Sequence, residues 1–210
     1  KMYPLYAKCV ELGIPANIHC SVNFSTATEM DFGHPRFLDE VMIHFPELRV
    51  CAAPPGWPWV QELIAVAWRH PNVWIGLAPV RPKYLNVANS GYEPLLQYGN
   101  TILQDRIIFG SSYPLMPVER SIAEIKTLPL KEAVKRKWLH DNAARLLGRL
   151  EKRSQREMQN AGTAEREPLV LRFSACIVQN VVPSCRRIRS SYSSSQKRSG
   201  SRTATWLGSW

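Results

Sequence analysis

The sequence has few cysteines and no long apolar run, which excludes two broad classes of protein. Its five cysteines form no CxxC pair and no regular framework, so a disulfide scaffold is not expected and a reducing compartment is favoured. No stretch of 18 or more apolar residues occurs, so no transmembrane helix is predicted. The segment Lys1–Pro4 lacks the apolar region of a signal peptide. We therefore expect a cytoplasmic protein without a membrane span.

Several motifs that define enzyme classes are missing as well. No HxH pair, HExxH motif or CxxC pair is present, so no complete metal site can be read from local spacing. Nothing resembling GxGxxG opens a helix after a strand, which argues against a dinucleotide-binding fold. The serines at Ser111 and Ser112 do not form GxSxG, so a serine hydrolase is not expected.

The charge of the chain divides it into two parts. The whole sequence carries a formal net charge of +10, but residues 1–150 hold 16 Lys and Arg against 13 Asp and Glu. Residues 151–210 hold 11 against 4 and include Arg186–Arg189 and the serine-rich run Ser190–Ser195. This second part shows no sustained apolar period, so we predict a basic, disordered C-terminal tail. Such a tail would contact nucleic acid only weakly and without sequence preference.

Residues 1–150 alternate between strand-like and helix-like patterns. Short apolar runs predict four strands, at Ile14–His19, Arg49–Ala53, Val73–Leu77 and Ile107–Phe109. Apolar residues spaced three and four apart predict the intervening and flanking helices, at Leu5–Leu12, Pro35–Phe45, Pro58–Arg69, Tyr92–Tyr98, Val118–Lys126, Leu130–His140 and Asp141–Leu147. Asp141 is the expected N-cap of the last helix. Four β–α units in series predict an α/β protein with a parallel sheet.

The number of units suggests part of a barrel. A (β/α)8 TIM barrel has about 250 residues, and residues 1–150 would supply half of one. A doubly wound sheet is the alternative for the same pattern. Each predicted strand delivers side chains to its carboxyl end, where barrel enzymes carry their sites. His19 ends the first predicted strand, and Pro54 and Ser112 follow the second and the fourth.

Histidine and cysteine near these strand ends allow two chemical interpretations. His19 can be a metal ligand, since imidazole is the commonest neutral one, but a histidine after an apolar run is more often a structural, hydrogen-bonded residue. His34, in a loop before Pro35, is the one other histidine expected to reach a site. Cys20 is a conceivable nucleophile, although neighbours in a strand point to opposite faces, which argues against a Cys20–His19 pair.

A set of motifs in residues 3–149 resembles the carboxyl half of a known family. The matching pieces, in order, are Pro4–Tyr6, Glu11–Pro15, Ile18–His19, Phe45–Leu48, Pro55–Trp59, His70–Val73, Arg106–Ser111 and Asn142–Leu147. They resemble the amidohydrolase-related branch that includes aminocarboxymuconate-semialdehyde decarboxylase and the hydroxybenzoate decarboxylases. The resemblance implies strands 5–8 of a (β/α)8 barrel with a divalent metal, usually zinc. It also implies hydrolysis or nonoxidative decarboxylation of small carboxylated or cyclic substrates.

The resemblance also assigns roles to single positions. His19 matches a metal ligand of the family's fifth strand. Pro54 stands where the family has a catalytic histidine, and Ser112 stands where it has an aspartate that binds the metal. Trp57, Trp59 and Tyr113 are the expected substrate-pocket residues.

These departures lead to two hypotheses about function. The first is a metal-dependent hydrolase or carboxy-lyase whose activity is weak or absent because ligand positions are lost. The second is a noncatalytic, barrel-derived interaction protein that binds through the open half-barrel or an apolar rim at Trp57, Trp59 and Trp74. Open edges of a half-barrel also predict self-association.

Overall fold

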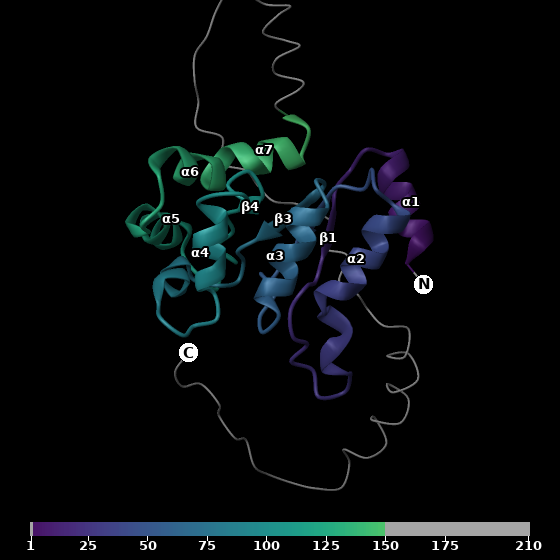
Figure 1. Ribbon diagram of the computed structural model, residues 1–210, viewed down its shortest axis with the longest axis horizontal. Helices are drawn as coiled ribbons and strands as arrows, with labels where there is room; N and C mark the ends of the chain where they lie inside the picture. The colour runs from purple at the N-terminus through teal and green to yellow at the C-terminus, as the bar shows by residue number, and fades with distance from the viewer. Residues whose placement is uncertain (1, 150–210) are drawn as a thin grey trace, which may run out of the picture. The chain divides into compact units, whose positions relative to one another are not determined.

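A computed structural model describes residues 2–149 and contains one parallel four-stranded sheet (Figure 1). Its strands are β1 (Ala16–Ile18), β2 (Val50–Ala52), β3 (Val73–Gly76) and β4 (Ile107–Ile108), and they pair in chain order. The α/β class and the parallel sheet predicted from the alternating patterns are confirmed. The predicted tail of residues 151–210 lies outside the described residues.

Helices precede and follow the strands as expected, and two short 3-10 turns were not predicted. The helices are α1 (Tyr3–Glu11), α2 (Pro35–His44), α3 (Val60–Arg69), α4 (Glu93–Gly99), α5 (Val118–Thr127), α6 (Glu132–Arg136) and α7 (Asn142–Leu146). The 3-10 turns are η1 (Met30–Gly33) and η2 (Pro82–Asn86), and a π-helical turn, η3 (Lys137–Asp141), joins α6 to α7. No helix within residues 2–149 is long and apolar enough to cross a membrane.

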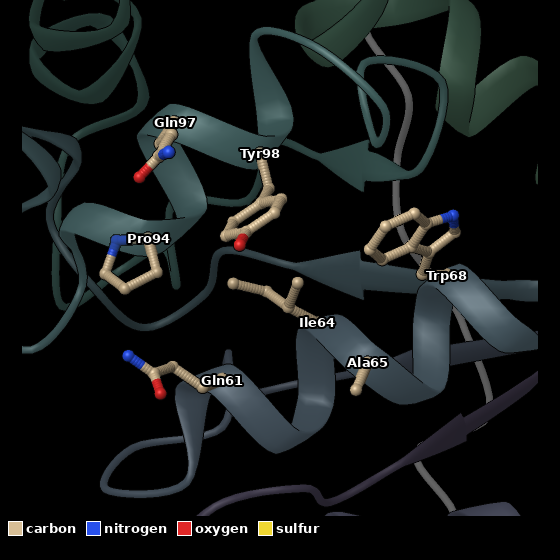
Figure 2. Close-up of a pocket in the computed structure, with 7 residues that line it drawn as sticks. All are labelled: Gln61, Ile64, Ala65, Trp68, Pro94, Gln97 and Tyr98. Atoms are coloured by element: carbon tan, nitrogen blue, oxygen red, sulfur yellow. The ribbon is translucent and has the colours of Figure 1, made fainter.

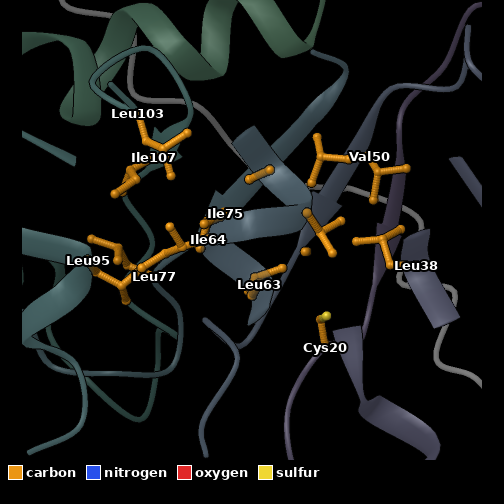
Figure 3. Packing of buried hydrophobic residues seen from close by; sticks show 14 of the residues in the cluster. Cys20, Leu38, Val50, Leu63, Ile64, Ile75, Leu77, Leu95, Leu103 and Ile107 are labelled. Carbon is orange, nitrogen blue, oxygen red and sulfur yellow. The ribbon is translucent and has the colours of Figure 1, made fainter. Parts of the chain in front are cut away.

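The main core lies between one face of the sheet and helices α2, α3 and α4 (Figure 3). Helix α3 buries Val60, Leu63, Ile64 and Ala67, the apolar stripe that predicted it. Leu63 is completely buried with Ile75 of β3, and burial of a side chain of this size contributes about 1.5–3 kcal/mol. This core fixes the strands and therefore the loops at their carboxyl ends.

Part of the opposite face of the sheet, at β3 and β4, is covered by the C-terminal helix α7. Trp74 and Ile108 of this face are each 3% exposed and pack with Ala143 and Leu146 of α7. The expectation that Trp74 forms part of an exposed apolar rim is therefore wrong. The sequence pattern places Trp74 on a strand but does not indicate that a helix 70 residues later covers it.

Asp141 directly precedes α7, as predicted, but it does not act as a side-chain N-cap. Asp141 has φ −66° and ψ −37° and caps no helix with its side chain, because the backbone stays helical from α6 through η3 into α7. In the π turn, the Asn142 N–H donates to the Lys137 carbonyl instead of the Trp138 carbonyl. The Trp138 carbonyl oxygen accepts a hydrogen bond from the Phe109 N–H at 2.9 Å instead. The π turn thus ties the C-terminal helix to the end of β4.

Candidate active site at the strand ends

The parallel sheet brings the three positions singled out by the sequence to one edge. His19 directly follows β1, Pro54 lies just beyond β2, and Ser112 lies in the loop after β4. Because all four strands run in the same direction, these residues lie at the carboxyl edge of the sheet. The β3 end separates Pro54 from Ser112.

The loop after β1 folds back over His19 and is fastened to the loop after β2. His19 Nε2 lies 3.1 Å from the carbonyl oxygen of Ser21. Ser21 Oγ donates a 2.6 Å hydrogen bond to the Trp57 carbonyl, which also accepts from the Val22 N–H at 2.8 Å. Ser21 is 4% exposed, so this contact is shielded from water. His19 is therefore held by a connected pair of loops.

His34 and Trp59 form a second contact of these loops. Their ring centroids lie 4.5 Å apart, and His34 Nδ1 accepts a 3.2 Å hydrogen bond from the Arg36 N–H at the start of α2. His34 is thus a helix N-cap, a role that the sequence analysis did not assign to it. Trp59 is half-buried, whereas Trp57 is 39% exposed.

The loop after β4 holds Ser112 in an unusual backbone conformation. Ser112 has φ +56°, in the left-handed region that costs a residue with a Cβ free energy. Ser111 Oγ accepts a 3.3 Å hydrogen bond from the Tyr113 N–H, and Tyr113 is 74% exposed. Ser112 offers a neutral hydroxyl at this edge, and Pro54 offers no polar side-chain group.

The residues at this edge do not fit a divalent metal ion. Nowhere in residues 2–149 do three or more His, Cys, Asp or Glu side chains come together as metal ligands. Asp39 is bound to Arg69 and His70. Asp105 is bound to Lys137 and Arg145. Both carboxylates are in structural ion pairs near the amino ends of the strands, since His70 precedes β3 and Asp105 precedes β4.

The cysteines near the site are not reactive. Cys20 is 1% exposed, and burial raises the pKa of its thiol to about 12. Burial raises the pKa of the Cys51 thiol to about 12 as well. Both thiols are therefore protonated at neutral pH, and the nucleophile is the thiolate. Cys20 is not a candidate nucleophile.

A groove of about 290 Å³ lies elsewhere, on the helical layer between α3 and α4 (Figure 2). Its lining residues are Gln61, Ile64, Ala65, Trp68, Pro94, Gln97 and Tyr98. None of these side chains is charged, and none belongs to a strand-end loop. The groove is therefore separate from the candidate site.

A β–α series with polar positions at the carboxyl ends of parallel strands is the architecture of barrel enzymes. The similarity of this chain to known proteins supports the same architecture. A family model described as amidohydrolase matches residues 1–149. The chain belongs to the amidohydrolase family, as the sequence motifs suggested. No protein with a curated description matches the chain.

The chain is also similar to a solved structure of a TIM-barrel protein. An uncharacterised TIM-barrel protein of Bordetella bronchiseptica is 36% identical, with a TM-score of 0.61. The match covers 71% of this chain and 51% of that protein. The chain thus spans about half the length of this TIM-barrel relative.

Two decarboxylases show weaker likeness. The 5-carboxyvanillate decarboxylase of Sphingomonas paucimobilis is 16% identical with a TM-score of 0.48, over 70% of this chain and 52% of that one. A dihydroxybenzoic acid decarboxylase of Polaromonas sp. JS666, solved with manganese and the inhibitor 2-nitroresorcinol, is 13% identical with a TM-score of 0.45, over 70% of this chain and 53% of that one. Likeness at this level does not identify a reaction for this chain.

Proposed function

We propose that residues 1–150 form the second half of a (β/α)8 barrel, equivalent to strands 5–8, followed by a separate basic tail. The sequential, parallel order of β1 to β4 supports this proposal, since consecutive strands are neighbours in such barrels. The coverage of about half of the TIM-barrel relative also supports it.

We further propose that the chain is a metal-dependent hydrolase or carboxy-lyase by descent whose own activity is weak or absent. The observation that carries this proposal is the composition of the strand ends. His19 is the one residue in the family's ligand and catalytic positions that retains a metal-binding side chain. A zinc site needs three or four protein ligands, so His19 alone cannot hold zinc or a similar ion against water.

The backbone at Ser112 gives independent support for an ancestral aspartate. Asp and Asn adopt positive φ values more readily than other residues that carry a Cβ. Ser112 at φ +56° therefore occupies a position that suits aspartate better than serine. Its hydroxyl carries no charge at neutral pH and is too weak a base to take a proton from metal-bound water.

Carbon dioxide release tests this proposal. The full chain is incubated with zinc or manganese and with 5-carboxyvanillate or a dihydroxybenzoic acid, the substrates named for the two decarboxylases above. We expect no release above that of the His19→Gln variant. Metal-dependent release that disappears in His19→Gln would overturn the proposed loss of activity.

A noncatalytic binding role is the second candidate, and exposed apolar side chains favour it. Phe24, Trp57, Tyr113 and Leu115 in the strand-end loops are 82%, 39%, 74% and 88% exposed. Interaction sites are formed where exposed apolar side chains lie next to one another, so these residues are candidates for such a site. Light scattering of the full chain against a Phe24→Ser, Leu115→Ser variant tests whether a second copy is the partner. A dimer that dissociates in the variant supports that partner, and a monomer in both forms excludes it.

A further inference from the structure

Gly33, at the end of η1, lies against the imidazole of His19, which directly follows β1. A Cβ atom on Gly33 would lie 1.8 Å from the Ser21 carbonyl oxygen and 2.9 Å from His19 Cδ2. Contacts below 3.0 Å essentially never occur for a real Cβ atom. Gly33 is buried at the end of η1, so a larger residue there has to displace either the Ser21 carbonyl or the ring.

The requirement for glycine at this position is steric. Gly33 is not among the described glycines with a positive φ, unlike Gly13, Gly56, Gly91 and Gly148. Its backbone is therefore open to any residue, and the space beside His19 is what excludes a side chain. This distinguishes Gly33 from the turn glycines of the fold.

The contact with Ser21 determines which nitrogen of His19 carries the proton. A carbonyl oxygen can only accept, so at 3.1 Å the neutral ring donates through Nε2–H. Nδ1 is then unprotonated, and no hydrogen bond reaches it from the residues that the structure describes. Among the described residues, His19 Nδ1 therefore keeps a lone pair that accepts no hydrogen bond.

We propose that Gly33 is a positioning residue for His19. By leaving room for the Ser21 carbonyl against the ring, it holds the imidazole in the Nε2–H tautomer with Nδ1 as the available nitrogen. The significance of that nitrogen for a site rests on the proposed function. The positioning itself does not, because it concerns contacts within the folded chain.

Long-range ¹H–¹⁵N spectra of the histidine rings in the full chain test this directly. The spectra are recorded at pH 8, and the His19 signals are identified by their loss in His19→Gln. We expect the wild-type His19 ring to be protonated at Nε2 alone. In Gly33→Ala we expect a mixture of the Nε2–H and Nδ1–H tautomers. Gly110→Ala is the matched control. Like Gly33, Gly110 has no positive φ, and its added Cβ would clash, at 2.8 Å from Ala78 Cβ. No His19 atom is among the nearest neighbours of that Cβ. Its His19 signals should match the wild type.

His34 serves as an internal reference in every variant. Its Nδ1 accepts from the Arg36 N–H, so its ring should remain protonated at Nε2. A wild-type His19 protonated at Nδ1, or an unchanged His19 tautomer in folded Gly33→Ala, would overturn the proposal. Where Gly33→Ala does not fold, Ser21→Ala decides, because it removes the hydrogen bond to the Trp57 carbonyl that fixes Ser21. A mixed His19 tautomer in Ser21→Ala supports the proposal, and an unchanged one contradicts it.

Discussion

Asn142 Nδ2 donates a 2.8 Å hydrogen bond to the carbonyl oxygen of Ile107, linking the start of α7 to the outer edge of β4. The same amide donates to the Gln104 carbonyl at 2.9 Å. With the bond from the Phe109 N–H to the Trp138 carbonyl, η3 and the start of α7 bind main-chain groups on the outer side of β4. Of the two edges expected to be open, the β4 edge is thus occupied by the chain itself.

We predict that Asn142→Ala destabilises the fold by about 1–3 kcal/mol, because it leaves the buried Ile107 carbonyl without its donor. Urea unfolding measures the change in the free energy of unfolding. Asn72→Ala is the control, since Asn72 Nδ2 donates to the Pro46 carbonyl in an exposed setting. Equal decreases in the free energy of unfolding would show that the buried contact with β4 stabilises the fold no more than the exposed contact of Asn72.

The left-handed backbone of Ser112 gives a second prediction. Ser112→Gly should raise the free energy of unfolding by about 1 kcal/mol, because glycine adopts positive φ values without the steric cost of a Cβ. Ser112→Asp should be tolerated better than Ser112→Val, whose branched side chain suits this conformation least. Thermal unfolding of the three variants measures the order, and Ser112→Val as the most stable form would contradict it.

Restoring two lost side chains should not restore catalysis. We predict no measurable decarboxylation by the double variant Ser112→Asp, Pro54→His, because residues 2–149 contain no group of three His, Cys, Asp or Glu side chains that could complete a metal site around the restored ones. Carbon dioxide release with added zinc or manganese provides the measurement, and His19→Gln in the same background is the control. Turnover that depends on His19 would show that His19 and the two restored side chains are sufficient as metal ligands.

The raised pKa values of the Cys20 and Cys51 thiols predict a loss of stability at alkaline pH. Burial raises the pKa of Cys20 and Cys51 to about 12, whereas thiols in an unfolded chain ionise near about 8.5. The contribution of these thiols to the free energy of unfolding is complete below the thiol pKa of the unfolded chain. It is lost as the pH rises from that value toward 12, because only the unfolded state releases the thiol protons in that range. The expected slope is on the order of 1 kcal/mol per pH unit for each thiol.

Urea unfolding between pH 8 and 11 checks this slope. Cys20→Ala should reduce the pH dependence while also lowering stability at pH 8 through the lost packing of its buried side chain. An unchanged slope in Cys20→Ala would mean that other groups, such as Tyr6 with its raised pKa, control the alkaline transition.

The strands and most helices could be predicted from the sequence, because local apolar spacing determines them. The stripe Val60, Leu63, Ile64 and Ala67 identified α3, and its residues are buried as expected. The continuous helix around Asp141 could not be predicted, since it depends on a contact between Trp138 and the distant Phe109. Short-range rules favour an N-cap at an aspartate and contain no information on that contact.

The sequence predicted which residues of the candidate site lie at the strand ends, but not the residues that pack against them. A histidine, a proline and a serine after three strands could be assigned to one edge because parallel strands end together. The role of Gly33 was not predictable, because a glycine in a loop gives no sign that its missing side chain makes room for His19. The N-cap role of His34 was equally hidden, since Ser, Thr, Asp and Asn are the residues usual at that position.

Metal stoichiometry tests the central claim most directly, namely that the strand ends of this chain cannot hold a divalent metal. The purified full chain is dialysed with excess zinc or manganese, freed of loosely bound ion, and analysed for metal by mass spectrometry beside His19→Gln. We predict well below one ion per chain, with no difference between the two proteins. One tightly bound ion per wild-type chain that is lost in His19→Gln would contradict the account.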